Sequence, residues 1–186
     1  IEALHTKHVV FPDVNLITDR NYALELFNAL IPLKIIWLGL VTSSLGIDDE
    51  LLAVFRKSGC RGLLIGFESI TQESQKYIHK GVNRVDSYVE LMKKLHDNGI
   101  LVQGCFAFGG DEEDESVFDR TVEMIIKAKI DLPRYSILTP FPRTAYYEQL
   151  SKEGRIIEDN WAMYDVQHCV FRPKLMTKEQ LEAGTD

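Results

Sequence analysis

Cysteine is scarce in this sequence. The three cysteines, Cys60, Cys105 and Cys169, lie far apart and form no Cys-x-x-Cys pair. An odd number of widely spaced thiols makes a poor disulfide framework, so we expect a reducing, cytoplasmic compartment. The same spacing argues against a zinc or iron–sulfur site built from this chain alone. We therefore expect each cysteine to be a small buried side chain.

Long apolar runs and basic clusters are also missing. No run approaches the roughly 18 apolar residues that span a bilayer, so no membrane partner is expected. The formal net charge is -7, which argues against binding to nucleic acid phosphates. Residues 1–7 lack the pattern of a signal peptide and an initiator methionine. We expect the natural protein to include an N-terminal part that precedes Ile1.

Several catalytic signatures are absent as well. There is no His-Glu-x-x-His, no Gly-x-x-x-x-Gly-Lys and no Gly-x-Gly-x-x-Gly in the sequence. No lysine lies inside an apolar strand, where burial would lower the pKa of its amine for imine chemistry. Zinc hydrolases, P-loop enzymes, dinucleotide-binding enzymes and Schiff-base aldolases are therefore disfavoured.

What the sequence does have is an alternation of strand-like and helix-like segments. Strand patterns recur every roughly thirty residues, which is the rhythm of repeated βα units. This predicts an α/β protein with parallel strands and outer helices. Five units are too few for a complete barrel of eight, so we expect a partial (β/α) barrel over 1–155 that lacks its first strand, and a C-terminal extension over 156–186 that packs on it. The expected strands are 9–11, 35–41, 61–67, 100–108 and 135–138, and the expected helices are 19–31, 48–59, 83–99, 116–126, 143–152 and one that starts at 177.

The segment from Arg61 to Ser69 is the centre of this pattern. It is a short apolar run that ends in Gly66-Phe67-Glu68-Ser69. In parallel sheets, residues just past the carboxyl ends of strands face the ligand, so Glu68 and Ser69 are candidates for binding a small molecule. The simpler interpretation is that Glu68 caps the next turn. Polar groups collect at the other strand ends too: Asp13, Asn15, Thr42, Ser43, Glu112, Glu113 and Thr139.

Five consecutive acids, 111–115, precede an expected helix. Negative charge at a helix start interacts favourably with the helix dipole and with free amides, by about 0.3–1 kcal/mol per charge. Capping is therefore the expected role of Asp114, and the role of Glu113 stays open. The glycine-bearing calcium loop pattern is absent.

Together, several short segments resemble the later half of radical S-adenosylmethionine enzymes. They are Ile65-Gly66-Phe67-Glu68-Ser69, Lys80, Asn98-Gly99-Ile100, and Phe106-Ala107-Phe108-Gly109 with Glu113. The segment 138–144, Leu-Thr-Pro-Phe-Pro-Arg-Thr, is similar to a Pro-Phe-Pro-Gly-Thr segment of one branch. That branch contains cobalamin-dependent members and the anaerobic magnesium-protoporphyrin monomethyl ester oxidative cyclase. Segments 11–15, 161–165 and 176–177 resemble other parts of the same branch.

The resemblance implies an enzyme with a partial (β/α)6 barrel, a [4Fe-4S] cluster, S-adenosylmethionine and a small-molecule substrate, with cobalamin in some members. It implies reductive cleavage of S-adenosylmethionine or methyl transfer. By the same resemblance, Glu68 contacts the ribose hydroxyls and Ser69 supports that turn. Lys80 pairs with the methionine carboxylate. Further contacts are implied for Phe106 and Phe108 at the adenine, Leu138 closing the adenine pocket, and Asp13 and Asn15 near the methionyl group or the substrate.

The sequence departs from the family in two ways. The Cys-x-x-x-Cys-x-x-Cys loop that ligates the cluster is absent, so the ligands are expected outside this segment and the fragment alone should be inactive. The family's Gly-x-Pro-Gly-Glu is replaced by 109–113, Gly-Gly-Asp-Glu-Glu, and Arg143 stands where glycine is common.

Three alternatives follow. The chain is a fragment of a radical S-adenosylmethionine enzyme that carries the nucleoside side of the site, a degenerate member without a cluster, or a barrel-like binding or scaffold domain with polar caps. A missing first strand would expose the edge at 9–11 and allow self-association.

Overall fold

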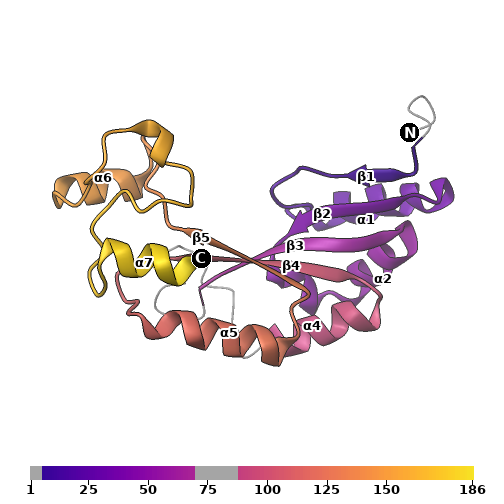
Figure 1. Ribbon diagram of the computed structural model, residues 1–186. Helices are drawn as coiled ribbons and strands as arrows, with labels where there is room; N and C mark the ends of the chain where they lie inside the picture. The colour runs from indigo at the N-terminus through magenta and orange to yellow at the C-terminus, as the bar shows by residue number, and fades with distance from the viewer. Residues whose placement is uncertain (1–5, 70–87) are drawn as a thin grey trace. The chain divides into compact units, whose positions relative to one another are not determined.

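The computed structural model describes residues 6–69 and 88–186 (Figure 1). The strands are β1 (His8–Val10), β2 (Ile36–Val41), β3 (Cys60–Glu68), β4 (Leu101–Phe108) and β5 (Leu132–Ile137). The α-helices are α1 (Arg20–Leu30), α2 (Asp49–Ser58), α4 (Tyr88–Asp97), α5 (Ser116–Ala128), α6 (Ala145–Lys152) and α7 (Lys178–Thr185). Short 3-10 helices are η2 (Ile31–Leu33), η3 (Ser43–Ile47) and η5 (Trp161–Met163).

The strands form one sheet in the order β1-β2-β3-β4-β5, so each strand lies next to its neighbour in the sequence. The β1–β2 and β2–β3 pairs are parallel. A connection that carries a helix separates consecutive strands, as in repeated βα units. The predicted α/β fold with a partial (β/α) barrel is confirmed.

The chain divides into two compact units. Among the described residues, the first contains 6–67, 88–105 and 125–133, and the second contains 68–69, 106–124 and 134–186. The predicted boundary between a barrel at 1–155 and an extension at 156–186 stays a prediction. The extension shares the second unit with the end of β4, with α6 and with residues 116–124 of α5.

An aromatic core fills one face of the sheet in the first unit. Trp37 on β2 stacks on Phe27 of α1 at 4.5 Å between ring centroids, and Phe55 of α2 meets its edge at 5.0 Å. The indole nitrogen of Trp37 donates a hydrogen bond to Ser58 Oγ at 3.1 Å, so its polar group is satisfied inside the core. These contacts explain why α1 and α2 pack together on this face (Figure 1).

The helix boundaries follow from capping side chains. Asp19 accepts a hydrogen bond from the Tyr22 amide, and Asp48 accepts one from the Leu51 amide, which fixes the starts of α1 and α2. The helix expected to start at 177 is α7, and it begins with a capping box in which Thr177 and Gln180 are bonded to each other's backbone. The expected start of the helix over 83–99 lies outside the described residues.

Strand β5 begins earlier than the sequence pattern indicates. We predicted 135–138, whereas the strand runs over Leu132–Ile137. Pro133 and Arg134 concealed its start, because proline and charge are depleted in central strands. β5 is the last strand in the sheet order, where proline is tolerated.

In the second unit, the C-terminal extension packs on the end of β4. A buried ion pair joins Asp111, just after β4, to Arg155, with 2.7 Å between Asp111 Oδ1 and Arg155 Nη2. Lys174 approaches the other oxygen of Asp111 at 2.6 Å. The Asp111 side chain is only 4% exposed, and it anchors the extension through Lys174 and the residue just before the extension through Arg155.

Gly59 and Gly99 provide a matched pair for testing backbone strain. Both have positive φ, 100° and 67°, but a Cβ at Gly59 would lie 1.9 Å from the Ile35 carbonyl oxygen, whereas one at Gly99 would have nothing within 4 Å. We expect Gly99→Ala to destabilise the protein by about 1 kcal/mol and Gly59→Ala by about 3 kcal/mol. Urea unfolding measures both, and equal losses would contradict the clash at Gly59.

The anchor at Asp111 predicts a dependence of stability on pH. Burial raises the pKa of Asp111, but hydrogen bonds from Arg155 and Lys174 outweigh burial and hold the pKa below its ordinary value of 3.8. The stabilisation is therefore fully present above pH 3.8 and is lost as pH falls through the lower pKa of the folded protein.

Replacing Asp111 tests this dependence. We expect Asp111→Asn to lose about 3 kcal/mol at pH 7, because it removes the buried carboxylate partner of Arg155 and leaves the more exposed Glu153, at 3.0 Å, to balance its charge. The difference from wild type should shrink as the pH falls below 3.8, measured by urea unfolding at several pH values. Glu115→Gln, at an exposed site, serves as the control and should change little. A difference that is constant with pH would contradict the ion pair.

Self-association through the edge at β1 also stays a prediction. Among the described strands, β1 lies at the end of the sheet order beside β2, and Val10 is 64% exposed. If the edge pairs between copies, Val10→Lys should shift the sedimentation coefficient toward the monomer, because charge on an edge strand blocks pairing. Val14→Lys, beyond the strand and 90% exposed, should leave it unchanged. A wild-type chain that stays monomeric at high concentration would contradict this prediction.

Candidate functional site

The end of β3 carries the candidate ligand residue. Glu68 is partly exposed and has a φ of 66°, in the left-handed region that non-glycine residues enter at a cost of about 1–2 kcal/mol. Strand alternation places Glu68 on the same face as Leu64, opposite the buried Phe67. Such backbone strain is found at binding and catalytic sites.

Ser69, the next residue, is buried and bonded to an acid that is distant in the sequence. Its hydroxyl donates to Glu113 Oε1 at 2.7 Å. The other oxygen of Glu113 accepts hydrogen bonds from the amides of Gly109 and Gly110, each at 2.9 Å. The Glu113 carboxylate therefore joins the residue after β3 to the turn after β4.

The two glycines let the chain wrap around this carboxylate. Gly109 has a φ of 106°, and a Cβ there would lie 3.0 Å from both Leu181 and Phe171 of the extension. A side chain at Gly109 would thus meet both backbone strain and crowding. Nearby, Asp114 accepts hydrogen bonds from the amide and hydroxyl of Ser116, which confirms its predicted role as the cap of α5.

Phe106 and Phe108 lie on the helix side of β4. They are 1% and 2% exposed, and the Phe108 ring meets Phe118 of α5 edge-on at 5.0 Å. Phe106 lies 6.2 Å from Tyr135 between ring centroids. A contact of either residue with adenine stays a prediction. In this arrangement it would be made by the backbone and not by the rings.

Leu138 is half-buried just after β5, where its amide donates to the Phe108 carbonyl oxygen at 2.8 Å. This bond places Leu138 at the carboxyl end of β4, in the same unit as Glu68 and Ser69. Leu138, whose contact with adenine is predicted, therefore follows the carboxyl end of a strand, as Ser69 does.

Asp13 and Asn15 belong to the first unit. Asn15 Oδ1 accepts the amide of Thr42 at 3.3 Å, which ties together the turns after β1 and β2. Asp13 is exposed in the turn after β1. Their predicted proximity to the methionyl group or the substrate stays a prediction, and Lys80 lies outside the described residues.

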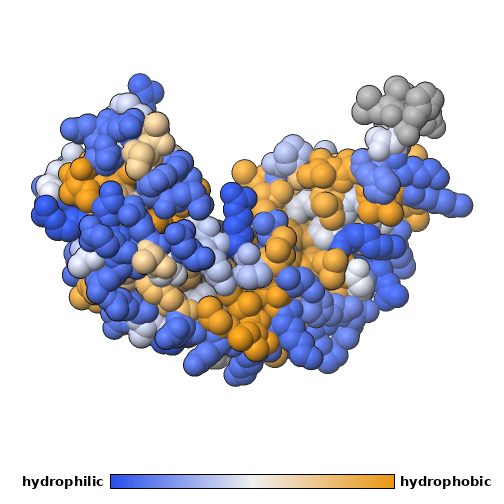
Figure 2. Space-filling model, in the orientation of Figure 1, coloured by the Kyte–Doolittle hydropathy of each residue, from blue (hydrophilic) through white to orange (hydrophobic). Residues whose placement is uncertain are grey.

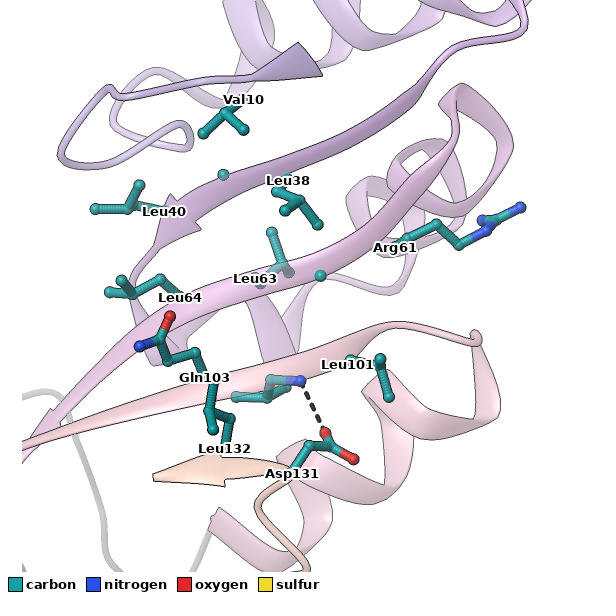
Figure 3. A pocket seen from close by; sticks show the side chains of 13 residues that line it. Val10, Leu38, Leu40, Arg61, Leu63, Leu64, Leu101, Gln103, Asp131 and Leu132 are labelled. Carbon is teal, nitrogen blue, oxygen red and sulfur yellow. Dashed lines mark hydrogen bonds between the residues drawn. The ribbon is translucent and has the colours of Figure 1, made fainter. Parts of the chain in front are cut away.

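The first unit has an apolar pocket of about 460 Å³ on the face of the sheet opposite its aromatic core (Figure 3). Apolar surface is visible over these strands in Figure 2. Leu38 and Leu101 are 45% and 61% exposed here, so within the described residues this face of the central strands is not fully covered. The main aliphatic side chains around the pocket are Val10, Leu38, Leu40, Leu64, Leu101 and Leu132.

Polar groups in this pocket are few. The amide of Gln103 is directed toward Leu64 in Figure 3. Asp131 lies at the rim, where it accepts the Val102 amide at 2.8 Å and lies 3.0 Å from His96 Nε2. The pocket residues on β3, Arg61 to Leu64, come from the amino-terminal half of that strand. In barrels, ligands bind at the carboxyl ends of the strands, so this pocket is not the candidate catalytic centre.

The cysteines of this chain do not fit an iron–sulfur cluster. Burial raises the pKa of the Cys60 thiol to about 12 and also raises that of Cys169, whereas a cluster ligand must be a thiolate. All three cysteines are free, and Cys105 is half-buried. Within 6–69 and 88–186, no group of three or more His, Cys, Asp or Glu side chains could hold a metal ion.

Two features of this site were not predicted from the sequence. The bond between Ser69 and Glu113 spans 44 positions, and so does the pair of Asp111 with Arg155. For the bond between Ser69 and Glu113, the sequence signal was the pair Gly109-Gly110 with an acid three residues later. The side chain of an acid at that position can fold back and accept hydrogen bonds from the two glycine amides.

The fold and the strand-end site define an enzyme-like α/β domain of the partial-barrel class. A model of the radical SAM superfamily matches residues 2–158 of the chain. The chain therefore belongs to the radical SAM superfamily, as the sequence motifs indicated.

Similar proteins include methyltransferases and a cyclase. The chain is 33% identical to bacteriochlorophyllide d C-12(1)-methyltransferase of Chlorobaculum tepidum over 92% of this chain and 37% of that protein. It is 24% identical to the anaerobic magnesium-protoporphyrin IX monomethyl ester cyclase of Cereibacter sphaeroides over 93% of this chain and 28% of that protein.

A solved structure has a similar fold. The radical S-adenosylmethionine methyltransferase TsrM from Kitasatospora setae, with cobalamin and a [4Fe-4S] cluster bound, matches 81% of this chain and 31% of that one. Its TM-score is 0.73 at 16% identity. The chain thus spans about a third of the length of these proteins. None of its described helices is long and apolar enough to cross a bilayer.

Proposed function

We propose that this chain is the nucleoside-binding side of a radical S-adenosylmethionine enzyme. The observation that carries the proposal is the strained Glu68 at the carboxyl end of β3, followed by a buried Ser69 bonded to Glu113. A carboxylate at a strand end accepts hydrogen bonds from two neighbouring hydroxyls well, and ribose presents such a pair. Glu68 would bind the ribose hydroxyls.

The other residues would orient and enclose the nucleoside. Leu138 would contact the adenine, with the backbone beside Phe106 and Phe108 forming part of the same wall. Asp13 and Asn15 would lie near the methionyl group or the substrate, and Lys80 would pair with the methionine carboxylate. S-Adenosylmethionine, when bound, supplies either a methyl group or, after one-electron reduction, a 5′-deoxyadenosyl radical.

We further propose that the whole enzyme transfers a methyl group to a small-molecule substrate of tetrapyrrole type, with cobalamin as a second cofactor. The identities of 33% and 30% to two bacteriochlorophyllide d methyltransferases and the fold of TsrM support this choice. The second candidate reaction is oxidative cyclisation, which the 24% identity to the anaerobic cyclase supports. The free cysteines are consistent with the reducing cytoplasm in which we place this enzyme.

The cluster ligands should lie elsewhere in the same protein. The sequence encoded directly upstream of Ile1 tests this part of the proposal. A Cys-x-x-x-Cys-x-x-Cys loop after a predicted strand is the expected result. A start codon close to Ile1, with no such loop, would favour a degenerate member or a binding and scaffold domain without radical chemistry.

The role of Glu68 is tested by Glu68→Gln in the whole protein. Replacing a carboxylate that accepts hydrogen bonds from the ribose should weaken S-adenosylmethionine binding about 10- to 100-fold, since hydrogen bonds to charged groups contribute about 1.5–3 kcal/mol. Anaerobic equilibrium dialysis measures the dissociation constant.

Glu115→Gln provides the matched control at an exposed position and should bind like wild type. The competing interpretation, in which Glu68 only caps the following turn, predicts lower stability with unchanged affinity. That outcome would contradict the proposed site.

A further inference from the structure

Glu113 has an unusual environment for a carboxylate. It is 2% exposed, and its hydrogen bonds come from a hydroxyl and two backbone amides, none of them charged. Burying a carboxylate is unfavourable unless it is well compensated. A neutral side chain would fill the same space without the desolvation free energy of a buried charge. A role for the charge must therefore lie in the hydrogen bonds that this carboxylate makes.

The bonds of Glu113 constrain the residue next to Glu68. Ser69 follows Glu68 directly, and the 2.7 Å bond to Glu113 holds its buried hydroxyl. With Ser69 held, the peptide after Glu68 has little freedom to rotate. The left-handed backbone of Glu68, with φ of 66°, requires such a restraint because an unrestrained chain would relax to a negative φ.

Glu113 is itself held by the turn after β4. Its own amide donates to the Gly110 carbonyl oxygen at 3.0 Å, and its Oε2 accepts the amides of Gly109 and Gly110. Phe171 and Leu181 of the extension lie so near Gly109 that a Cβ there would be 3.0 Å from each. The restraint on Glu68 therefore runs from the extension through the glycine turn and Glu113 to Ser69.

We propose that Glu113 is a positioning residue that acts through Ser69 to aim the Glu68 carboxylate at the ribose hydroxyls. This inference rests on the proposed function, in which Glu68 binds the nucleoside. Glu113 makes no contact with the ligand in this scheme. Its effect should appear only in the part of the affinity that depends on the ribose hydroxyls.

The experiment uses the whole protein and two probes, S-adenosylhomocysteine and its 2′,3′-dideoxy analogue. The dissociation constant of the dideoxy analogue divided by that of S-adenosylhomocysteine measures how much the ribose hydroxyls contribute to binding. We expect Glu68→Gln to reduce this ratio about 10-fold or more. Glu113→Gln and Ser69→Ala should reduce the same ratio at least about 3-fold, because either change releases the peptide after Glu68. Glu115→Gln is the control and should keep the wild-type ratio.

A double variant separates positioning from a purely structural role. If Glu113 acts through Glu68, the effects of Glu68→Gln and Glu113→Gln on the ratio will not add, since the second change has little left to remove. If Glu113 is only structural, its replacement will weaken both probes equally or neither, and the ratio will stay at its wild-type value. An unchanged ratio, or additive effects, would overturn the inference.

The outcomes also distinguish the two proposals. If Glu68→Gln leaves the ratio unchanged, the proposed nucleoside site fails, and the positioning role fails with it. If Glu68→Gln reduces the ratio but Glu113→Gln and Ser69→Ala do not, only the positioning role fails. Should Glu113→Gln fail to fold, Ser69→Ala decides the matter, because it removes the 2.7 Å bond and leaves the bonds to Gly109 and Gly110 in place.

Discussion

The buried carboxylate of Glu113 is the constraint on which the second unit's strand ends depend. One oxygen binds the hydroxyl that follows β3, and the other binds the glycine turn that follows β4. Because all its donors are uncharged, the carboxylate depends on the exact placement of these groups for its compensation. The chain around Glu68 is thereby held in a conformation that a free peptide would avoid.

The C-terminal extension also contributes to holding this turn. Phe171 and Leu181 leave no room for a side chain at Gly109, and Lys174 pairs with Asp111 two residues further along. The residues from Gly109 to Glu113 are thus fixed by hydrogen bonds to the strand ends, by the ion pair of Asp111 with Arg155 and by its ion pair with Lys174 of the extension. In physical terms, the extension is part of the support of the candidate site, although it contributes none of the predicted ligand contacts.

Local patterns were enough to predict most of the fold. The βα rhythm and the helices expected over 19–31 and 48–59 each depend on adjacent residues, and the structure confirms them as α1 and α2, with Asp19 and Asp48 as caps and a left-handed Gly59 after α2. Arg143 stands where the family has glycine and has a φ of 68°. This departure from the family pattern therefore places a non-glycine residue in a strained left-handed conformation. The pairing of Ser69 with Glu113 escaped prediction because it joins residues 44 positions apart, and no local propensity encodes such a contact. Family resemblance supplied the role of Glu68, which periodicity alone left open.

The most direct test of the central claim is a structure of the whole protein, prepared anaerobically, with S-adenosylmethionine bound. We expect the Glu68 carboxylate within hydrogen-bonding distance of both ribose hydroxyls, with the bond between Ser69 and Glu113 intact. A ribose held by other groups, with Glu68 directed away from it, would contradict both the nucleoside site and the restraint that we assign to Glu113.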